Sequence, residues 1–199
     1  MFLGKIFGEA LKKILSFVSL GVLVLVEILQ FSAAPGFVAF LMLTVVCLVA
    51  ASWIVGTLIK NDRLVMISAT TAVVLGAFLV FSNGAYVESL ADFFEENFAL
   101  GLGNMINSFV LICGLLVAVL LLVAYITKLK FIKFIASIVL FALAAVTVAN
   151  YIIYLIGLII LDAQEGVTLN WFMYVQPFYY VAIYLFAFVN FDKIAMVRE

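Results

Sequence analysis

One acidic residue, Glu27, lies well inside an apolar stretch of this 199-residue chain. An ionisable side chain in such a place is energetically expensive, and it often marks a functional site in a membrane protein. One hypothesis is therefore that Glu27 binds a proton or a cation. The alternative is structural: the carboxyl group reaches the outer surface of a membrane or forms a hydrogen bond to a neighbouring helix. The sequence indicates no polar partner at the same depth, which favours the structural alternative.

Two further groups of polar residues recur at helical spacing near the end of the chain. One group lies within 147–154 and the other within 176–184, where Pro177 lacks an amide hydrogen and interrupts the helical hydrogen bonding. If the two groups face each other, they line an outward-facing cavity for a neutral or weakly polar ligand. The candidate cavity residues are Asn150, Tyr151, Tyr154, Gln176, Tyr180 and Tyr184.

The alternative for these residues is again structural, and it is the interpretation that the sequence favours. Tyrosine and tryptophan gather where a membrane meets water, because their rings are apolar and their polar atoms remain hydrated. The remaining polar groups would then form hydrogen bonds between helices. The predicted aromatic belt consists of Trp171, Phe172, Tyr174 and Tyr179.

The chain lacks the residues that most catalytic and cofactor sites require. It contains no histidine, which excludes His-dependent triads and the common zinc and haem sites. Its two cysteines, Cys47 and Cys113, lie in apolar stretches, where we expect small buried packing residues. No glycine-rich phosphate-binding loop is present. The sequence therefore predicts no catalytic, cofactor-binding or metal site, and the chain is not expected to be an enzyme.

Composition assigns the chain to membrane proteins. Hydrophobic residues make up 69% of the sequence and charged residues only 11%. A soluble domain has roughly 25% charged residues, so a soluble fold of this composition would leave its surface uncovered. Membrane lipids are the expected partners of this surface. The basic residues are few and scattered, which argues against nucleic-acid binding.

The basic residues also predict the orientation in the membrane. Short loops that contain lysine and arginine remain on the cytoplasmic side. All ten basic residues fall in four clusters, at the two ends of the chain and in two turns, and the segments between them carry only acidic charges. This pattern predicts an even number of crossings with both ends inside. The residues are Lys5, Lys12, Lys13, Lys60, Arg63, Lys128, Lys130, Lys133, Lys193 and Arg198.

A crossing takes about 20 apolar residues, so the chain holds six crossings with little left over. We expect an all-α integral membrane protein with a single transmembrane domain over 1–199 and no extramembrane domain. The opposite orientations of the first and last three crossings would also fit an inverted repeat, although the halves share no convincing sequence similarity. The predicted crossings are 14–31, 37–59, 64–82, 105–127, 134–161 and 171–191.

Two amphipathic stretches lie outside the predicted crossings. Residues 2–15 form an apolar stripe opposite basic residues, so this segment either lies on the inner surface or continues directly into the first crossing. Residues 86–98 place phenylalanines on one helical face and acids on the other, which predicts an interfacial helix on the outer surface. Gly101 and Gly103 are expected to lead from this helix into the fourth crossing.

Small residues at four-residue spacing predict how two of the crossings pack. Helices in lipid associate through close packing and hydrogen bonds, and small side chains let their backbones approach. The second and third crossings share a four-residue turn, so we expect a close antiparallel hairpin. Contact with another subunit is the alternative use of this face. The predicted packing face consists of Ser52, Gly56, Ser68, Ala72 and Gly76.

These features favour a non-catalytic, multi-pass subunit or accessory protein of a larger membrane assembly. Its expected partners are other membrane subunits or further copies of itself. The alternative is a small transporter or channel for a neutral or weakly polar solute or an ion, which would use the polar patch between the fifth and sixth crossings. The charge pattern and apolar composition suit the inner membrane of a bacterium.

Overall fold

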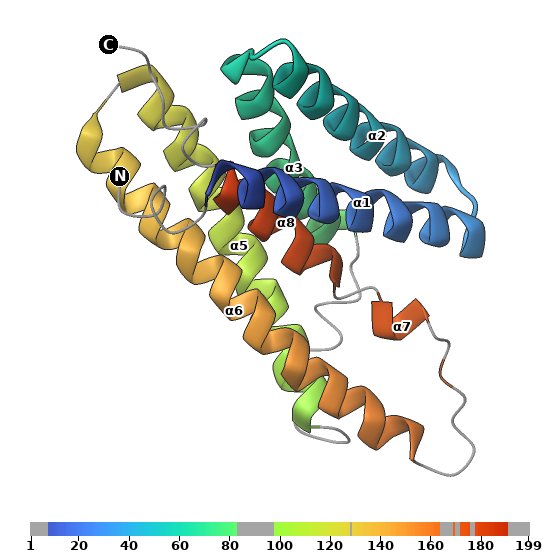
Figure 1. Ribbon diagram of the computed structural model, residues 1–199. Helices are drawn as coiled ribbons and strands as arrows, with labels where there is room; N and C mark the ends of the chain where they lie inside the picture. The colour runs from blue at the N-terminus through green and yellow to red at the C-terminus, as the bar shows by residue number, and fades with distance from the viewer. Residues whose placement is uncertain are drawn as a thin grey trace.

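The computed structural model describes residues 8–82, 98–127, 129–163, 169, 172–175 and 178–190. Every regular element in this part of the chain is an α-helix (Figure 1). The predicted outer helix at 86–98 lies almost entirely outside the described residues, as does the part of the N-terminal amphipathic segment before residue 8. The helices are α1 (Glu9–Ala33), α2 (Phe37–Leu58), α3 (Asp62–Ser82), α5 (Phe98–Thr127), α6 (Lys130–Asp162), α7 (Phe172–Val175) and α8 (Phe178–Val189).

Four of the described helices, α1, α2, α5 and α6, are long and apolar enough to cross a membrane. Large apolar side chains are exposed along their outer faces, including Phe17 on α1, Phe109 on α5 and Phe131 on α6. A water-soluble protein rarely exposes so much apolar surface, whereas lipid covers it at no cost. The chain is therefore a helical membrane protein. The apolar helix α8 is shorter, with 12 residues.

The helix boundaries match the predicted crossings best in the first half of the chain. α2 ends one residue before the predicted limit of 59, and α3 begins two residues before the predicted 64. α1 begins at Glu9, so the described end of the amphipathic segment continues directly into the first crossing. In the second half, α5 begins at Phe98 and α6 at Lys130, well before the predicted 105 and 134.

The early start of α5 corrects the prediction that Gly101 and Gly103 lie ahead of the crossing. Both glycines are buried inside α5. A Cβ atom at Gly103 would lie 3.1 Å from Cδ2 of Tyr154 on α6. Gly103 therefore allows α5 and α6 to approach each other, and neither glycine ends a helix. At about 1.5 Å per residue, α5 and α6 are about 45 and 50 Å long, which exceeds the ~30 Å hydrocarbon core of a bilayer.

The turn between α2 and α3 is closed by Asn61. Its backbone N–H donates to the carbonyl oxygen of Gly56 at 2.7 Å, and its side-chain oxygen accepts a hydrogen bond from the backbone N–H of Arg63 at 3.1 Å. The preceding residue, Lys60, has φ of 55°, the left-handed conformation in which helices commonly end. Because one asparagine ends α2 and caps α3, the two helices form a tight antiparallel hairpin.

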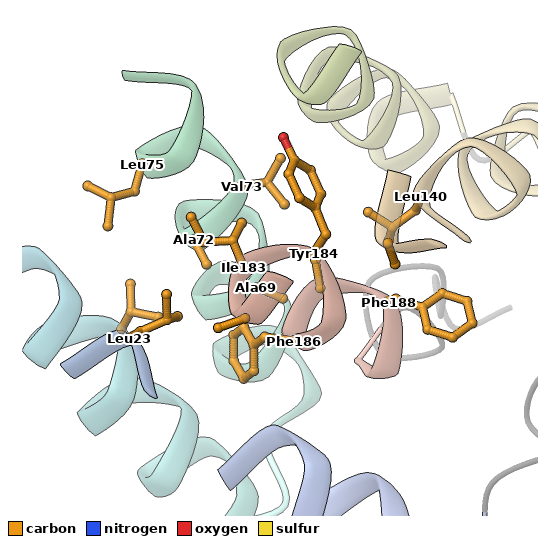
Figure 2. Close-up of a cluster of buried hydrophobic side chains, with 14 of the residues drawn as sticks. Leu23, Ala69, Ala72, Val73, Leu75, Leu140, Ile183, Tyr184, Phe186 and Phe188 are labelled. Carbon is orange, nitrogen blue, oxygen red and sulfur yellow. The ribbon is translucent and has the colours of Figure 1, made fainter. Parts of the chain in front are cut away.

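The core of the bundle surrounds α8. This helix packs against α1, α3 and α6, and nearly all of its side chains are buried. Figure 2 shows Ile183, Tyr184 and Phe186 extending from α8 among residues of α1, α3 and α6. The ring of Phe186 meets Trp53 of α2 edge to face, with ring centroids 6.1 Å apart. An apolar helix covered on all sides is a central element of a bundle.

Candidate functional site

Glu27 lies on the face of α1 that points into the bundle. Its side chain is fully buried, with 0% of its surface exposed. The buried residues of α1 recur every three or four positions and so form one inward face. They are Ser16, Ser19, Leu20, Leu23, Val26 and Glu27. Glu27 is therefore held inside by the same periodicity that buries its apolar neighbours. The predicted alternative, in which the carboxyl group reaches the outer surface, does not fit this burial.

Tyr179 on α8 is the polar residue that faces Glu27. Its side chain is buried as well, with 3% exposed, and its hydroxyl group interacts electrostatically with the carboxyl group. The two groups are near each other. Neither carboxyl oxygen of Glu27 nor the hydroxyl of Tyr179 has a hydrogen-bond partner among the described residues. Tyr179 was expected in an outer aromatic belt, but its side chain is buried between α8 and α1.

A network of hydrogen bonds fixes the other end of the α1–α8 contact. The side-chain amide of Asn190 donates to the hydroxyl oxygen of Ser16 on α1 at 2.9 Å. Its side-chain oxygen accepts a hydrogen bond from Nε1 of Trp53 on α2 at 3.0 Å. Asn190 therefore ties together three helices that are far apart in sequence. Asn190, Ser16 and Trp53 were not among the site residues predicted from the sequence. The sequence feature that could have identified this contact is an asparagine at the end of an apolar span.

The two contacts between α1 and α8 are in register. Ser16 and Glu27 are eleven residues apart on α1, and Tyr179 and Asn190 are eleven residues apart at the C-terminal end of the chain. At about 1.5 Å per residue, both intervals span about 16 Å. The helices therefore run antiparallel with matched spacing. Burial of Glu27 against Tyr179 follows directly once Asn190 is fixed on Ser16.

The candidate cavity residues do not share one site among the described contacts. The side-chain amide of Asn150 on α6 donates to the side-chain oxygen of Asn107 at 2.8 Å and to the carbonyl oxygen of Gly103 at 2.9 Å, both on α5. Tyr154 packs over Gly103 in the same interface. Asn150 and Tyr154 therefore face α5. The side-chain oxygen of Asn150 has no hydrogen-bond partner among the described residues.

The remaining candidate tyrosines lie in separate contacts. The hydroxyl of Tyr184 on α8 donates to the carbonyl oxygen of Val110 on α5 at 3.1 Å and lies directly over Gly114. Tyr180 is buried next to Tyr179. The hydroxyl of Tyr151 donates to the carbonyl oxygen of Tyr174 at 3.3 Å. Gln176 lies outside the described residues, so the cavity remains a prediction.

The structure brings together most of the predicted packing face between α2 and α3. The hydroxyl groups of Ser52 and Ser68 share a hydrogen bond of 2.7 Å across the hairpin. A Cβ atom at Gly56 would lie 2.8 Å from Cβ of Leu64, so the backbones are close at this point. Ala72 is buried one turn after Ser68. Gly76 belongs to α3, but its surroundings are not described.

The cysteines do not form a site with other ligating residues. Cys47 is exposed on the outer face of α2 and Cys113 is half-buried on α5, so the expectation of a buried packing residue is wrong for Cys47. Within the described residues, no group of three histidine, cysteine, aspartate or glutamate side chains is positioned to hold a metal ion. Among the described residues, unsatisfied polar groups from two different helices meet at Glu27 and Tyr179.

Fold and site together define a polytopic helical membrane protein whose buried polar residues connect its helices. No protein-family model matches this chain, and no curated protein or solved structure matches it either.

Proposed function

We propose that this chain is a non-catalytic, multi-pass subunit or accessory protein of a larger membrane assembly. The observation that carries this proposal is the use of buried polar side chains as links between helices. Asn190, Asn150 and Tyr184 each donate a hydrogen bond to a helix other than their own, and the central helix α8 is covered by its neighbours. Polar groups that line a transport pathway would be directed at water or at a solute instead.

The proposed topology has six crossings with both ends inside the inner membrane of a bacterium. Its support is the way the helix ends meet. Ser16 near the start of α1, Trp53 near the end of α2 and Asn190 after α8 lie together. Basic residues lie next to these positions at Lys12, Lys13 and Lys60. These two basic clusters lie near one end of the bundle, which supports the orientation expected from the charge rule for cytoplasmic loops.

Native mass spectrometry after gentle extraction from the original host tests this proposal. We expect the chain to leave the membrane with other membrane proteins at fixed stoichiometry. A mock purification from cells that lack the tagged chain identifies carry-over proteins. A lone monomer, or a symmetric assembly of this chain only, would overturn the accessory role.

A second candidate function is a small transporter driven by protons or cations, and the burial of Glu27 favours it. A fully buried acid without a hydrogen-bond partner among the described residues is unusual for a residue that serves only packing. The test is solute or ion flux in vesicles containing the purified chain. Glu27→Gln should abolish a pH-dependent flux while preserving the shape of the side chain. An unchanged flux in this variant would remove Glu27 from the transport hypothesis.

A further inference from the structure

Two helices each bring a buried polar side chain without a described hydrogen-bond partner to the same place. Glu27 comes from α1 and Tyr179 from α8, and their polar groups interact across the helix interface. The fixed contact at Asn190 and Ser16 holds this interface in register. The packing of the two helices therefore brings Glu27 and Tyr179 together, independently of the rotamer of either side chain.

The chemistry of this pair depends on a proton. A carboxylate only accepts hydrogen bonds, whereas a protonated carboxyl group also has an O–H donor. Burying a carboxylate without a cation is costly, and that cost disappears when the group takes up a proton. The phenol of Tyr179 can donate a hydrogen bond to either form of the carboxyl group, and it can accept one only from the protonated form.

We propose that Glu27 and Tyr179 form a proton-binding site between α1 and α8. The Glu27 carboxylate takes up one proton and becomes a neutral carboxyl group, and the Tyr179 hydroxyl forms a hydrogen bond with it. Loss of that proton leaves a negative charge inside the α1–α8 interface and weakens the contact there. The inference goes beyond the accessory role and holds whether the chain is a subunit or a transporter.

Among the residues that the structure describes, none near Glu27 is a cation that could neutralise a carboxylate. Tyr179 and the adjacent Tyr180 are the titratable residues that α8 places here. α2, which packs against α1, contains no acidic or basic residue, and its titratable Cys47 is exposed. The charged residues described on α1 and at the start of α3 lie towards the opposite end of the interface; they are Glu9, Lys12, Lys13, Asp62 and Arg63.

The pair suits a proton better than a metal ion. Calcium takes six to eight oxygen ligands, and magnesium requires six in an octahedron. The two carboxyl oxygens and one phenol oxygen at this site are three oxygen atoms, at most half of the ligands that either ion requires. Backbone carbonyl groups nearby on α1 are held within the helix. A proton requires only one oxygen atom and one hydrogen-bond partner.

Infrared difference spectroscopy between acidic and alkaline pH tests the proposal on the full-length protein in lipid vesicles. We expect a C=O stretching band of a protonated carboxyl group that shifts when glutamate is labelled with carbon-13. Glu27→Gln should eliminate this band. Tyr179→Phe should move it to higher frequency, because the carboxyl group loses its hydrogen bond. Glu9→Gln is the matched control, since Glu9 is an exposed acid on the same helix and its loss should leave the band in place.

Three outcomes would overturn the proposal. The first is a difference spectrum without any Glu27-dependent carboxyl band. The second is a Glu27 band that does not respond to Tyr179→Phe, and the third is loss of the band when sodium ions are added at constant pH, which would assign a metal-cation site. If Glu27→Gln fails to fold, carbon-13 labelling combined with Tyr179→Phe still identifies the carboxyl group beside Tyr179. Native mass spectrometry reports partners independently, so failure of the proposed function is distinguishable from failure of the proton site.

Discussion

The side-chain oxygen of Asn190 accepts a hydrogen bond from Nε1 of Trp53 at 3.0 Å, across 137 residues of sequence. The same asparagine donates to Ser16 and to the carbonyl oxygen of Phe186 in the preceding turn. Each polar atom of the Asn190 side chain is therefore used, and one residue connects α1, α2 and the end of α8. Such a residue determines how the first hairpin docks on the central helix.

Replacing Asn190 should loosen this junction. Asn190→Ala leaves the Trp53 N–H and the Ser16 hydroxyl without this partner, and we expect a loss of about 1–2 kcal/mol in unfolding free energy. Trp53→Phe keeps a ring against Phe186 and deletes only the donor, so its loss should be smaller. Equilibrium unfolding in mixed detergent micelles, followed by circular dichroism, measures both. Ser32→Ala, at an exposed position of α1, is the control. Wild-type stability of Asn190→Ala would contradict a structural role for this junction.

Gly114 should not tolerate a larger side chain, because the Tyr184 hydroxyl occupies the space of a Cβ atom. Gly114→Ala is expected to destabilise the protein by about 1–3 kcal/mol through overpacking between α5 and α8. Tyr184→Phe removes the hydroxyl group and its hydrogen bond to Val110. The double variant should therefore lose less stability than the sum of the two single variants.

A double-mutant cycle in the same unfolding assay measures this coupling. Gly21→Ala is the matched control, because nothing lies within 4 Å of a Cβ atom added at Gly21. It should be neutral or slightly stabilising, as expected for glycine replaced by alanine within a helix. Additive effects of Gly114→Ala and Tyr184→Phe would show that the two residues do not interact.

Gly56 should be required for the turn between α2 and α3. A Cβ atom there would lie 2.8 Å from Cβ of Leu64 and 3.1 Å from the backbone nitrogen of Val65. The backbone contact cannot be relieved by rotating a side chain, so Gly56→Ala should move the start of α3 and cost about 1–3 kcal/mol. The Ser52–Ser68 hydrogen bond lies one turn deeper and should lengthen as well.

Crosslinking across the hairpin provides a direct measurement of that movement. With both native cysteines replaced by alanine, Ser52→Cys and Ser68→Cys together should form a disulfide readily under mild oxidation. Adding Gly56→Ala should slow this reaction, whereas Gly36→Ala should not, because Gly36 has open space around it. Equal rates in all three backgrounds would contradict close packing at Gly56.

The predicted orientation can be tested with single cysteines at the helix ends. Ala34→Cys and Ala163→Cys follow α1 and α6 on the predicted outer side, and Gly8→Cys and Leu129→Cys precede the same helices on the predicted inner side. In a background without native cysteines, a membrane-impermeant maleimide should label the first two in intact cells. The other two should react only after permeabilisation. Labelling of position 129 from outside would reverse the proposed topology, and none of these substitutions removes a charge.

The sequence predicted the helices of the first hairpins well because the signals there are local. Apolar length, basic turns and the Ser52, Gly56 and Ser68 spacing each act within a few turns of one segment. The boundaries of α5 and α6 were predicted less well. The apolar length of a segment indicates where the chain crosses the membrane, but the helix can continue beyond that apolar segment. Gly103 is an example. A glycine near the expected end of a crossing suggests a break in the helix, but this glycine lies inside α5 and makes room for the Tyr154 side chain.

The candidate sites depended on contacts between distant segments, which composition and periodicity do not contain. Asn150 and Tyr184 were grouped by depth and helical face, but Asn150 faces Asn107 and Tyr184 faces Val110, both on α5. Tyr179 resembled an interfacial tyrosine because it lies near the predicted outer end of a span. Its burial against Glu27 follows from the docking of α1 on α8, which only the fold specifies.

By itself, the sequence determined that this chain is a helical membrane protein, because an apolar composition of this extent requires lipid around it. It also singled out Glu27, because an acid inside an apolar helix is conspicuous in any arrangement. Tertiary structure decided that Glu27 is fully buried, that Tyr179 faces it and that Asn190 holds the two helices in register. The physical reason is that burial and pairing are properties of the surface between helices. That surface is formed by residues more than 150 positions apart, and their relative placement is fixed only when the whole bundle packs.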